Sequence, residues 1–168
     1  MEYLALYLTD YTQEIAAGVV DIFKVCSSKR IQWKTLIVHF ADTNQNRFLH
    51  LILSEARKLQ QFKEVELTST WNRAALTNET AMELRHMMTS EKGLQSLGLT
   101  NMRLLPGVLS TLSQGLRADR IGRLRLANVD IPDMVRGVDM ADGEIMIDHE
   151  QNSEGGGEVA YFIEELRR

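Results

Sequence analysis

The sequence predicts an α/β fold in which strands and helices alternate and the strands form one parallel sheet. Two observations lead to this prediction. Short apolar triplets begin at residues 4, 36, 65, 97 and 124, so the intervals between them are 32, 29, 32 and 27 residues. Each interval also contains apolar residues at helical spacing. A parallel strand-helix-strand unit needs about 30 residues, so the intervals have the length that such units require.

The strands are expected at the triplets, and the clearest copy is "LQSLGLTNMRL" at 94–104. Leu97 and Leu99 share one strand face, while Leu94 and Leu104 would reach the same core from the bends before and after the strand. The other copies are LAL at 4–6, LIV at 36–38, VEL at 65–67, LRL at 124–126 and a weaker IMI at 145–147. The residue three before the triplet is apolar in several copies: Trp33, Phe62, Leu94 and Ile121.

The helices are expected between the triplets, each with one apolar face. Asp10 precedes Gln13 by three residues, which indicates the start of the first helix. Thr77 or Asn78 would cap the third helix, and Pro106 would stand in the first turn of the fourth. The apolar faces are Ile15, Val19, Ile22 and Phe23; Leu49, Ile52, Leu53, Ala56 and Leu59; Ala81, Leu84 and Met88; and Leu109, Leu112 and Leu116.

A glycine-rich stretch, "NSEGGGE" at 152–158, resembles a linker, because three consecutive glycines are entropically costly to order. The segment beyond it, "EVAYFIEELRR", has the pattern of an amphipathic helix. We therefore expect a repeat domain over residues 1–151, followed over 152–168 by a linker and a C-terminal capping helix.

The repeated unit resembles the leucine-rich repeat family, whose pattern is L-x-x-L-x-L-x-x-N/C-x-L. The first copy matches at Leu94, Leu97, Leu99 and Leu104, and "IGRLRLANVDI" matches at Ile121, Leu124, Leu126 and Ile131. Both copies depart at the asparagine position, where Met102 and Val129 stand, with Asn101 and Asn128 one residue early. The family's asparagine ladder is therefore expected to be absent. The intervals are similar to those of the long, helix-bearing class, which includes ribonuclease inhibitor and the sensor regions of NOD-like receptors.

This resemblance implies a leucine-rich repeat solenoid of about five to six divergent repeats, with strands on the concave side of a curved sheet and helices on the convex side. It also implies a cytoplasmic, non-enzymatic module that binds a protein partner, as part of a NOD-like immune receptor or another cytosolic regulator. A compact α/β domain is the alternative, because buried parallel strands are also rich in leucine and valine. Its small-molecule or enzymatic site would lie at the carboxyl ends of the strands, near His39, Asp42, Thr68 and Asn101.

Composition and motifs restrict the function. The chain has 168 residues, 44% of them hydrophobic, and a net charge of −4, which makes bulk affinity for nucleic acid unfavourable. Its single cysteine, Cys26, is consistent with a reducing compartment. No apolar run approaches the roughly 20 residues that span a bilayer. We found no catalytic motif and no metal-ligand spacing around the histidines, so we expect no enzyme, no metal and no cofactor.

The expected binding residues come from the positions that flank and separate each pair of core residues, which in the family face the concave side. They are Tyr3, Tyr7, Ile37, His39, Glu64, Glu66, Arg123 and Arg125. Tyrosine and arginine are enriched at interface hot spots, so this column predicts a surface for a protein partner. A strand close to Met1 would also leave an open sheet edge, and from that we expect self-association or an N-terminal partner.

Overall fold

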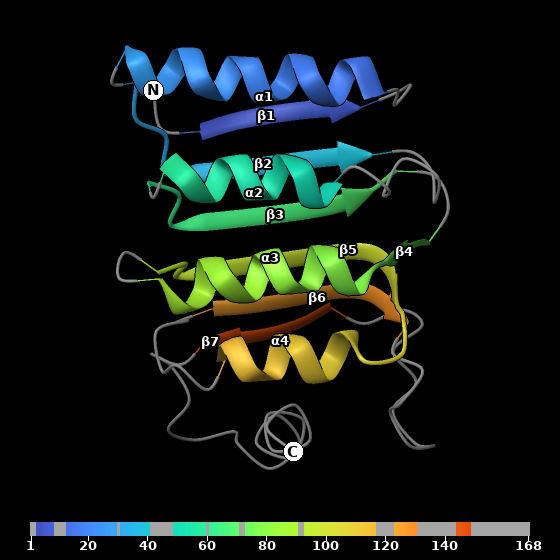
Figure 1. Cartoon of the computed structure of the whole chain (residues 1–168). Helices are drawn as coiled ribbons and strands as arrows, with labels where there is room; N and C mark the ends of the chain where they lie inside the picture. Colours follow the sequence, from blue (N-terminus) through green and yellow to red (C-terminus); the bar gives the residue numbers. More distant parts are fainter. Residues whose placement is uncertain are drawn as a thin grey trace.

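The computed structural model describes residues 3–8, 13–29, 31–40, 49–59, 61–70, 73–90, 93–116, 123–130 and 144–148. Strands and helices alternate along these ranges, which confirms the α/β class (Figure 1). In chain order the elements are β1 (Tyr3–Leu8), α1 (Gln13–Ser28), β2 (Thr35–Phe40), α2 (Leu49–Leu59), β3 (Glu64–Ser69), β4 (Ala74–Leu76), α3 (Asn78–Thr89), β5 (Ser96–Leu104), α4 (Val108–Leu116), β6 (Arg123–Asp130) and β7 (Glu144–Asp148). The predicted boundary at residues 151 and 152, and the segment after it, lie outside the described residues.

The strands form one sheet in the order β1-β2-β3-β5-β6-β7, with the short β4 paired to β5. Every strand pair is parallel except β6 with β7. Leu4 pairs with Leu36, Leu36 with Val65, Val65 with Leu97 and Leu97 with Leu124. The triplets aligned in the sequence are therefore neighbours in the sheet, with no shift in register.

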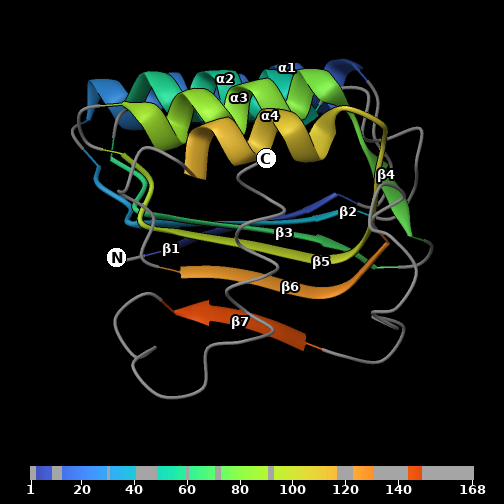
Figure 2. The ribbon, with the colours of Figure 1, turned by 90° about the horizontal axis from the view of Figure 1, so that it is seen from below.

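The helices cover a single face of the sheet, and each packs beside the next in chain order (Figure 2). The side chains of the strands alternate accordingly. In β2, Leu36, Val38 and Phe40 are buried under the helices, whereas Thr35, Ile37 and His39 are only partly covered. The same alternation holds in β3, where Val65 and Leu67 are fully buried. The core thus lies between the sheet and one helix layer, and none of the described helices covers the other face of the sheet.

The bend before each strand repeats as well. Leu94 is buried, as predicted, and so are Trp33 and Phe62 at the equivalent positions of two other copies. Ile121 lies outside the described residues. Successive bends are tied by backbone hydrogen bonds, because Lys63 N donates to Lys34 O at 2.6 Å and Gln95 N donates to Lys63 O at 2.7 Å. These bonds satisfy backbone groups that the turn into the strand would otherwise leave unpaired.

Two helices follow the predicted apolar faces closely. Leu49, Ile52, Leu53 and Ala56 of α2, and Ala81, Leu84 and Met88 of α3, are buried. Thr77 is the N-cap of α3, and its hydroxyl oxygen accepts a hydrogen bond from Thr80 N. Hydrogen bonds from its own backbone and from Thr77 lower the pKa of the Glu79 carboxyl in the first turn.

The predicted face of α1 is partly wrong. Ala16, Val19, Phe23 and Cys26 face the core, whereas Ile15 and Ile22 are 38% and 47% exposed. Both isoleucines lie in one stripe of α1, because residues at i and i+7 share a helix stripe. The side of α1 next to α2 is a different one, lined by Ala17, Val20 and Lys24. The sequence pattern could not separate the core-facing side of α1 from the exposed stripe with Ile15 and Ile22, since both are apolar.

The strand ends also differ from the prediction in four ways. Leu104 belongs to β5 itself, because the strand continues past Asn101 to pair with both β4 and β6. The short strand β4 was not predicted. Pro106 lies in the turn before α4, which begins at Val108. The weak sixth triplet forms β7, but the strand runs antiparallel to β6 and so does not continue the parallel series.

Candidate protein-binding face

The residues predicted to bind a partner all belong to the sheet face opposite the helices, which we call the open face. It is formed by alternate residues of five strands in register. These are Tyr3, Ala5 and Tyr7; Thr35, Ile37 and His39; Glu64, Glu66 and Thr68; Ser96, Gly98 and Thr100; and Arg123, Arg125 and Ala127. Because the register has no shift, residues from distant parts of the sequence form straight rows across the strands.

The β1 and β2 end of the open face is aromatic and apolar. The rings of Tyr7 and His39 are stacked, with centroids 4.5 Å apart and planes 5° from parallel. Tyr3 and Tyr7 are 60% and 71% exposed, which is unusual for large side chains that carry much apolar area. Ile37 lies between them, in register with Ala5. This end of the face is a rigid aromatic surface open to solvent.

The centre of the open face is acidic. Glu64 and Glu66 project from β3, and the hydroxyl of Thr35 donates to Glu64 Oε2 at 3.0 Å. The next strand contributes Gly98, which has no side chain, and a Cβ there would lie 3.3 Å from Cγ of Glu66. The Glu66 side chain therefore lies over Gly98, where the surface is lowest.

The β6 end is basic. Arg123 and Arg125 lie on the open face, and Gly98 separates Arg125 from Glu66 in the same row. Since neighbouring strands are about 4.8 Å apart, the acidic and basic pairs are separated by roughly 10 Å. Backbone register also places Arg123 opposite Asp148 of β7. The face thus changes from aromatic to acidic to basic along the sheet.

The expected absence of an asparagine ladder is wrong for two units. Asn101 Nδ2 donates to Ser69 O at 2.9 Å, and Asn128 Nδ2 donates to Asn101 Oδ1 at 2.8 Å. Arg73 Nη2 then donates to Asn128 Oδ1. Both asparagines have positive φ, 55° and 51°, a left-handed conformation that asparagine tolerates better than most residues. In the sequence, each asparagine stands one residue before the motif's asparagine position, and this shift was interpreted as the loss of the ladder.

Two residues of the alternative small-molecule site are neighbours, because His39 pairs with Thr68 in adjacent strands on the open face. Asn101 is engaged in the ladder at the end of the next strand. Asp42 lies outside the described residues.

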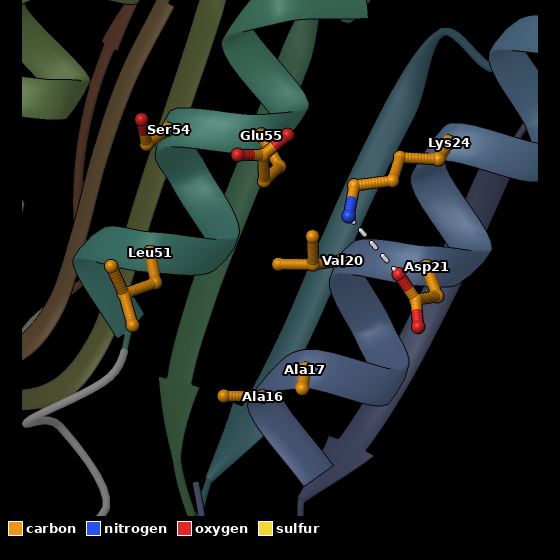
Figure 3. A pocket seen from close by; sticks show the side chains of 8 residues that line it. All are labelled: Ala16, Ala17, Val20, Asp21, Lys24, Leu51, Ser54 and Glu55. Atoms are coloured by element: carbon orange, nitrogen blue, oxygen red, sulfur yellow. Dashed lines mark hydrogen bonds and ion pairs between the residues drawn. The ribbon is translucent and has the colours of Figure 1, made fainter. Parts of the chain in front are cut away.

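A groove does occur, but between α1 and α2 on the outside of the helix layer (Figure 3). Ala16, Ala17, Val20 and Leu51 form its floor and walls, and the Asp21–Lys24 ion pair lies at its rim at 3.1 Å. Its volume of about 240 Å³ is below the roughly 300–1,000 Å³ of typical ligand pockets. Ser54 and Glu55 of α2 also line the groove, and the charged groups Asp21 and Glu55 are already paired with Lys24 and Lys58.

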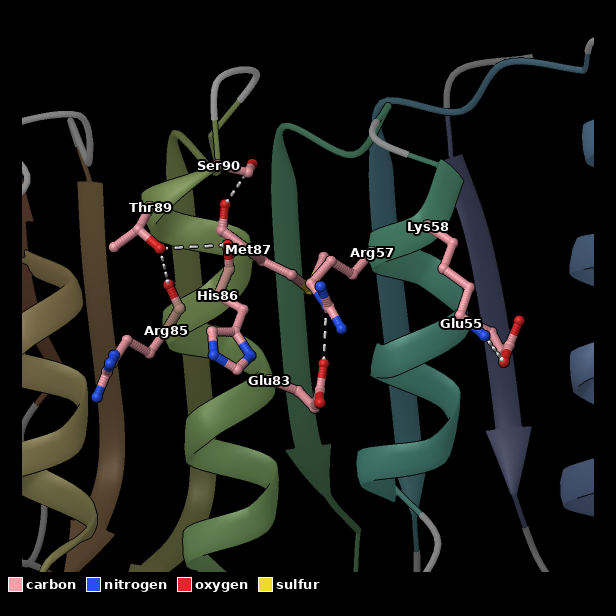
Figure 4. A network of polar contacts seen from close by, with 9 residues as sticks. All are labelled: Glu55, Arg57, Lys58, Glu83, Arg85, His86, Met87, Thr89 and Ser90. Carbon is pink, nitrogen blue, oxygen red and sulfur yellow. Dashed lines mark hydrogen bonds and ion pairs between the residues drawn. The ribbon is translucent and has the colours of Figure 1, made fainter.

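The polar contacts of the helix layer connect neighbouring helices (Figure 4). Arg57 Nε lies 3.0 Å from Glu83 Oε2, which joins α2 to α3, and Arg85 Nη1 donates to Gln114 Oε1 at 2.7 Å, which joins α3 to α4. Within α2, Lys58 pairs with Glu55. These partly exposed pairs join neighbouring helices, and each is expected to contribute at most about 1 kcal/mol to stability.

Cys26 is buried on the core face of α1, and burial raises the pKa of its thiol, with Lys29 partly opposing the shift. A raised pKa lowers the thiolate fraction, so this thiol is a poor nucleophile. In the described ranges, no three histidine, cysteine or acidic side chains are grouped to hold a metal. The described helices are also too short or too polar to cross a membrane.

Comparison with known proteins leaves the architecture without an assigned family. No family model matches the sequence, and no curated protein and no solved structure is significantly similar to it. The relation to leucine-rich repeat proteins therefore depends on the motif and on the arrangement of the elements.

Proposed function

We propose that the chain is a leucine-rich-repeat solenoid that binds a protein partner on its open face and catalyses no reaction. The observation that supports this proposal is the exposed aromatic cluster of Tyr3, Tyr7, Ile37 and His39, held on a sheet that the helices leave uncovered. Rigid aromatic side chains gain contact area at low entropic cost, which is why they dominate interface hot spots.

The arrangement of the repeats supports the solenoid part of the proposal. Successive strands lie side by side in chain order, and successive helices follow on one face. A doubly wound α/β domain would instead place helices on both faces of its sheet. The partial ladder of Asn101 and Asn128 adds support, because the resemblance implies such a ladder in the bend after each strand.

The charge pattern supports a partner that is itself a folded protein or a peptide. On the open face, β3 carries acidic side chains, β5 neutral ones and β6 basic ones, and the chain as a whole is acidic. A nucleic acid would favour a continuous basic surface with aromatic side chains between the cations. A mixed face selects a partner by complementary charge while the aromatic end contributes contact area. By resemblance, the setting would be a cytosolic regulator.

The test is site-specific photo-cross-linking. A photoreactive amino acid at Tyr7 and, as matched control, at Met82 of α3 compares two exposed positions on opposite sides of the molecule. Cross-linked proteins would be identified by mass spectrometry and then purified. Their affinity for the wild type, for Tyr7→Asp/Ile37→Asp and for Met82→Asp would be measured by calorimetry.

The proposal requires a partner that cross-links at position 7 and not at 82. It also requires at least about a tenfold weaker affinity for the double variant than for Met82→Asp. A partner that cross-links preferentially at position 82, or that binds the double variant as well as the wild type, would show that the open face is not the binding surface.

A further inference from the structure

The N-terminal end of the stack, formed by β1 and α1, has an uncovered surface of its own. No described segment pairs with the outer edge of β1, which is the first strand of the sheet. Leu4 and Leu6 are only partly buried, whereas the equivalent Leu36 and Val38 of the next strand are completely buried. Among the described strands, β1 therefore has a neighbour on one side only.

The edge of β1 carries none of the features that usually prevent strand pairing. Its sequence is YLALYL, without charge or proline, whereas natural edge strands often carry lysine, proline or a bulge. About half of the backbone N–H and C=O groups of an edge strand point outward unpaired. Such an edge is a template for another strand.

The helix above this strand is apolar on the same side. Ile15, Gly18, Ile22 and Val25 recur at intervals of three and four residues, so they form one stripe on α1. The three larger side chains are exposed, and a Cβ added at Gly18 would meet no atom within 4 Å. Figure 1 shows α1 lying along β1 at the end of the stack, so the stripe and the strand edge form one continuous end surface.

We infer that a second copy of this chain docks on this end surface, with β1 pairing antiparallel to β1 across a two-fold axis at Ala5. Under this two-fold rotation, both β1 and the apolar stripe of α1 are complementary to their own copies. In the strands, Tyr3 would lie opposite Tyr7 of the other copy and Leu4 opposite Leu6, so each face keeps its own kind of side chain. In the helices, Ile15 would meet Val25 and Gly18 would meet Ile22, and the glycine allows close approach.

Size and charge agree with such a dimer. The strand has 6 residues and the helix 16, so the end surface is about 20 Å long in the strand layer and about 24 Å in the helix layer. It covers roughly 400 Å² per copy in projection, or about 800 Å² over both copies, which is the size of a weak, transient interface. Neither β1 nor the stripe carries a charge, so two copies do not repel each other there. A dimer that dissociates on dilution is the expected state.

In this dimer the two open faces join into one sheet. The aromatic clusters of both copies then meet at the two-fold axis, with each Tyr3 beside the partner's Tyr7. The charged side chains of β3 and β6 lie toward either end of the combined surface.

Sedimentation velocity over a hundredfold concentration range tests the inference. The wild type is expected to shift from monomer to dimer. Ala5→Lys places like charges opposite each other on the axis, and Ile22→Lys places a charge in the stripe, so each weakens dimerisation by about tenfold or more. Met82→Lys is the matched control, because Met82 and Ile22 are 48% and 47% exposed in the monomer.

The register is tested by mixing two variants. Ala5→Lys and Ala5→Glu are each expected to be monomeric, and an equimolar mixture is expected to recover the dimer, because only this register brings residue 5 of both copies together. Circular dichroism checks that each variant is folded, and Ile22→Lys tests the interface without altering the sheet. A wild type that stays monomeric throughout, a dimer insensitive to both lysines, or a mixture that fails to associate would overturn the inference.

Discussion

The two faces of the sheet are made by the same strands and have opposite physical properties. The face under the helices consists of fully buried aliphatic residues such as Leu36, Val65 and Leu97. The open face, one residue away along each strand, has exposed aromatic and charged side chains such as Tyr7, Glu64 and Arg123. Strand alternation therefore keeps the core residues apart from those of the open face, and one face can vary without changing the other.

The largest effect is expected from a charge on the covered face. Leu67→Asp would bury a carboxylate without a partner in a close-packed core, at a cost of more than about 4 kcal/mol. Thr68→Asp, on the open face of the same strand, should cost no more than about 1 kcal/mol. Urea unfolding monitored by circular dichroism compares the two variants. Similar losses at both positions would contradict the difference between the faces.

A smaller effect is expected at the bend that ends the strands. Asn101→Ala would lose the hydrogen bonds to Ser69 and Asn128 and strain the left-handed backbone, for a loss of about 2 kcal/mol in the free energy of unfolding. Asn101→Gly keeps the backbone conformation and should lose only about 1 kcal/mol. A double-mutant cycle with Asn128→Gly should give a coupling of about 0.5–1 kcal/mol. Additive losses would show that the asparagines act separately.

Two glycines, Gly115 in the helix layer and Gly98 on the open face, extend the comparison to how closely each side of the sheet is packed. A Cβ at Gly115 would lie 2.5 Å from Sδ of the buried Met88 and 3.3 Å from Cα of Arg85, so Gly115→Ala should cost about 1–2 kcal/mol. At Gly98, on the open face, the Cβ would meet only the flexible Glu66 side chain, and Gly98→Ala should change stability by less than about 0.5 kcal/mol. Thermal unfolding of both variants measures the difference. Equal shifts would mean that both glycines are equally crowded.

A small effect on stability is also expected from Tyr7→Asp/Ile37→Asp. The double variant removes the Tyr7–His39 stack, for a loss of about 1 kcal/mol, and leaves the core intact. At a dilution where both proteins are monomeric, small-angle scattering should show an unchanged radius of gyration, above the roughly 15 Å of a compact chain of 168 residues, as a solenoid requires. An unfolded variant would place these residues in the core, and a compact particle would exclude the solenoid.

The sequence predicted the α/β class, the register and the contents of the open face, because strand alternation and the repeat interval both act locally. Leu94 was recognised as a core residue for the same reason. The stripe of Ile15 and Ile22 was misassigned, because hydrophobicity alone does not reveal which side of a helix has a neighbour. The ladder of Asn101 and Asn128 was missed because its hydrogen bonds join residues that only the folded sheet brings together.

The direction of β7 was also beyond the sequence. Its alternation is the same whether it runs parallel or antiparallel to β6, and the choice depends on the connection before it. Arg123 and Arg125 were correctly predicted to lie on the open face, but the groups around them depend on which strand pairs with the outer edge of β6.

The register without shift has a consequence for the length of the molecule. Thr35 and Glu64 occupy equivalent positions in adjacent strands. A chain cut at one and rejoined at the other would lose a complete strand-helix unit and keep every later residue in phase. Loss or duplication of such a module would therefore change the width of the surface by one strand at a time, which gives evolution or protein engineering a simple means of resizing it.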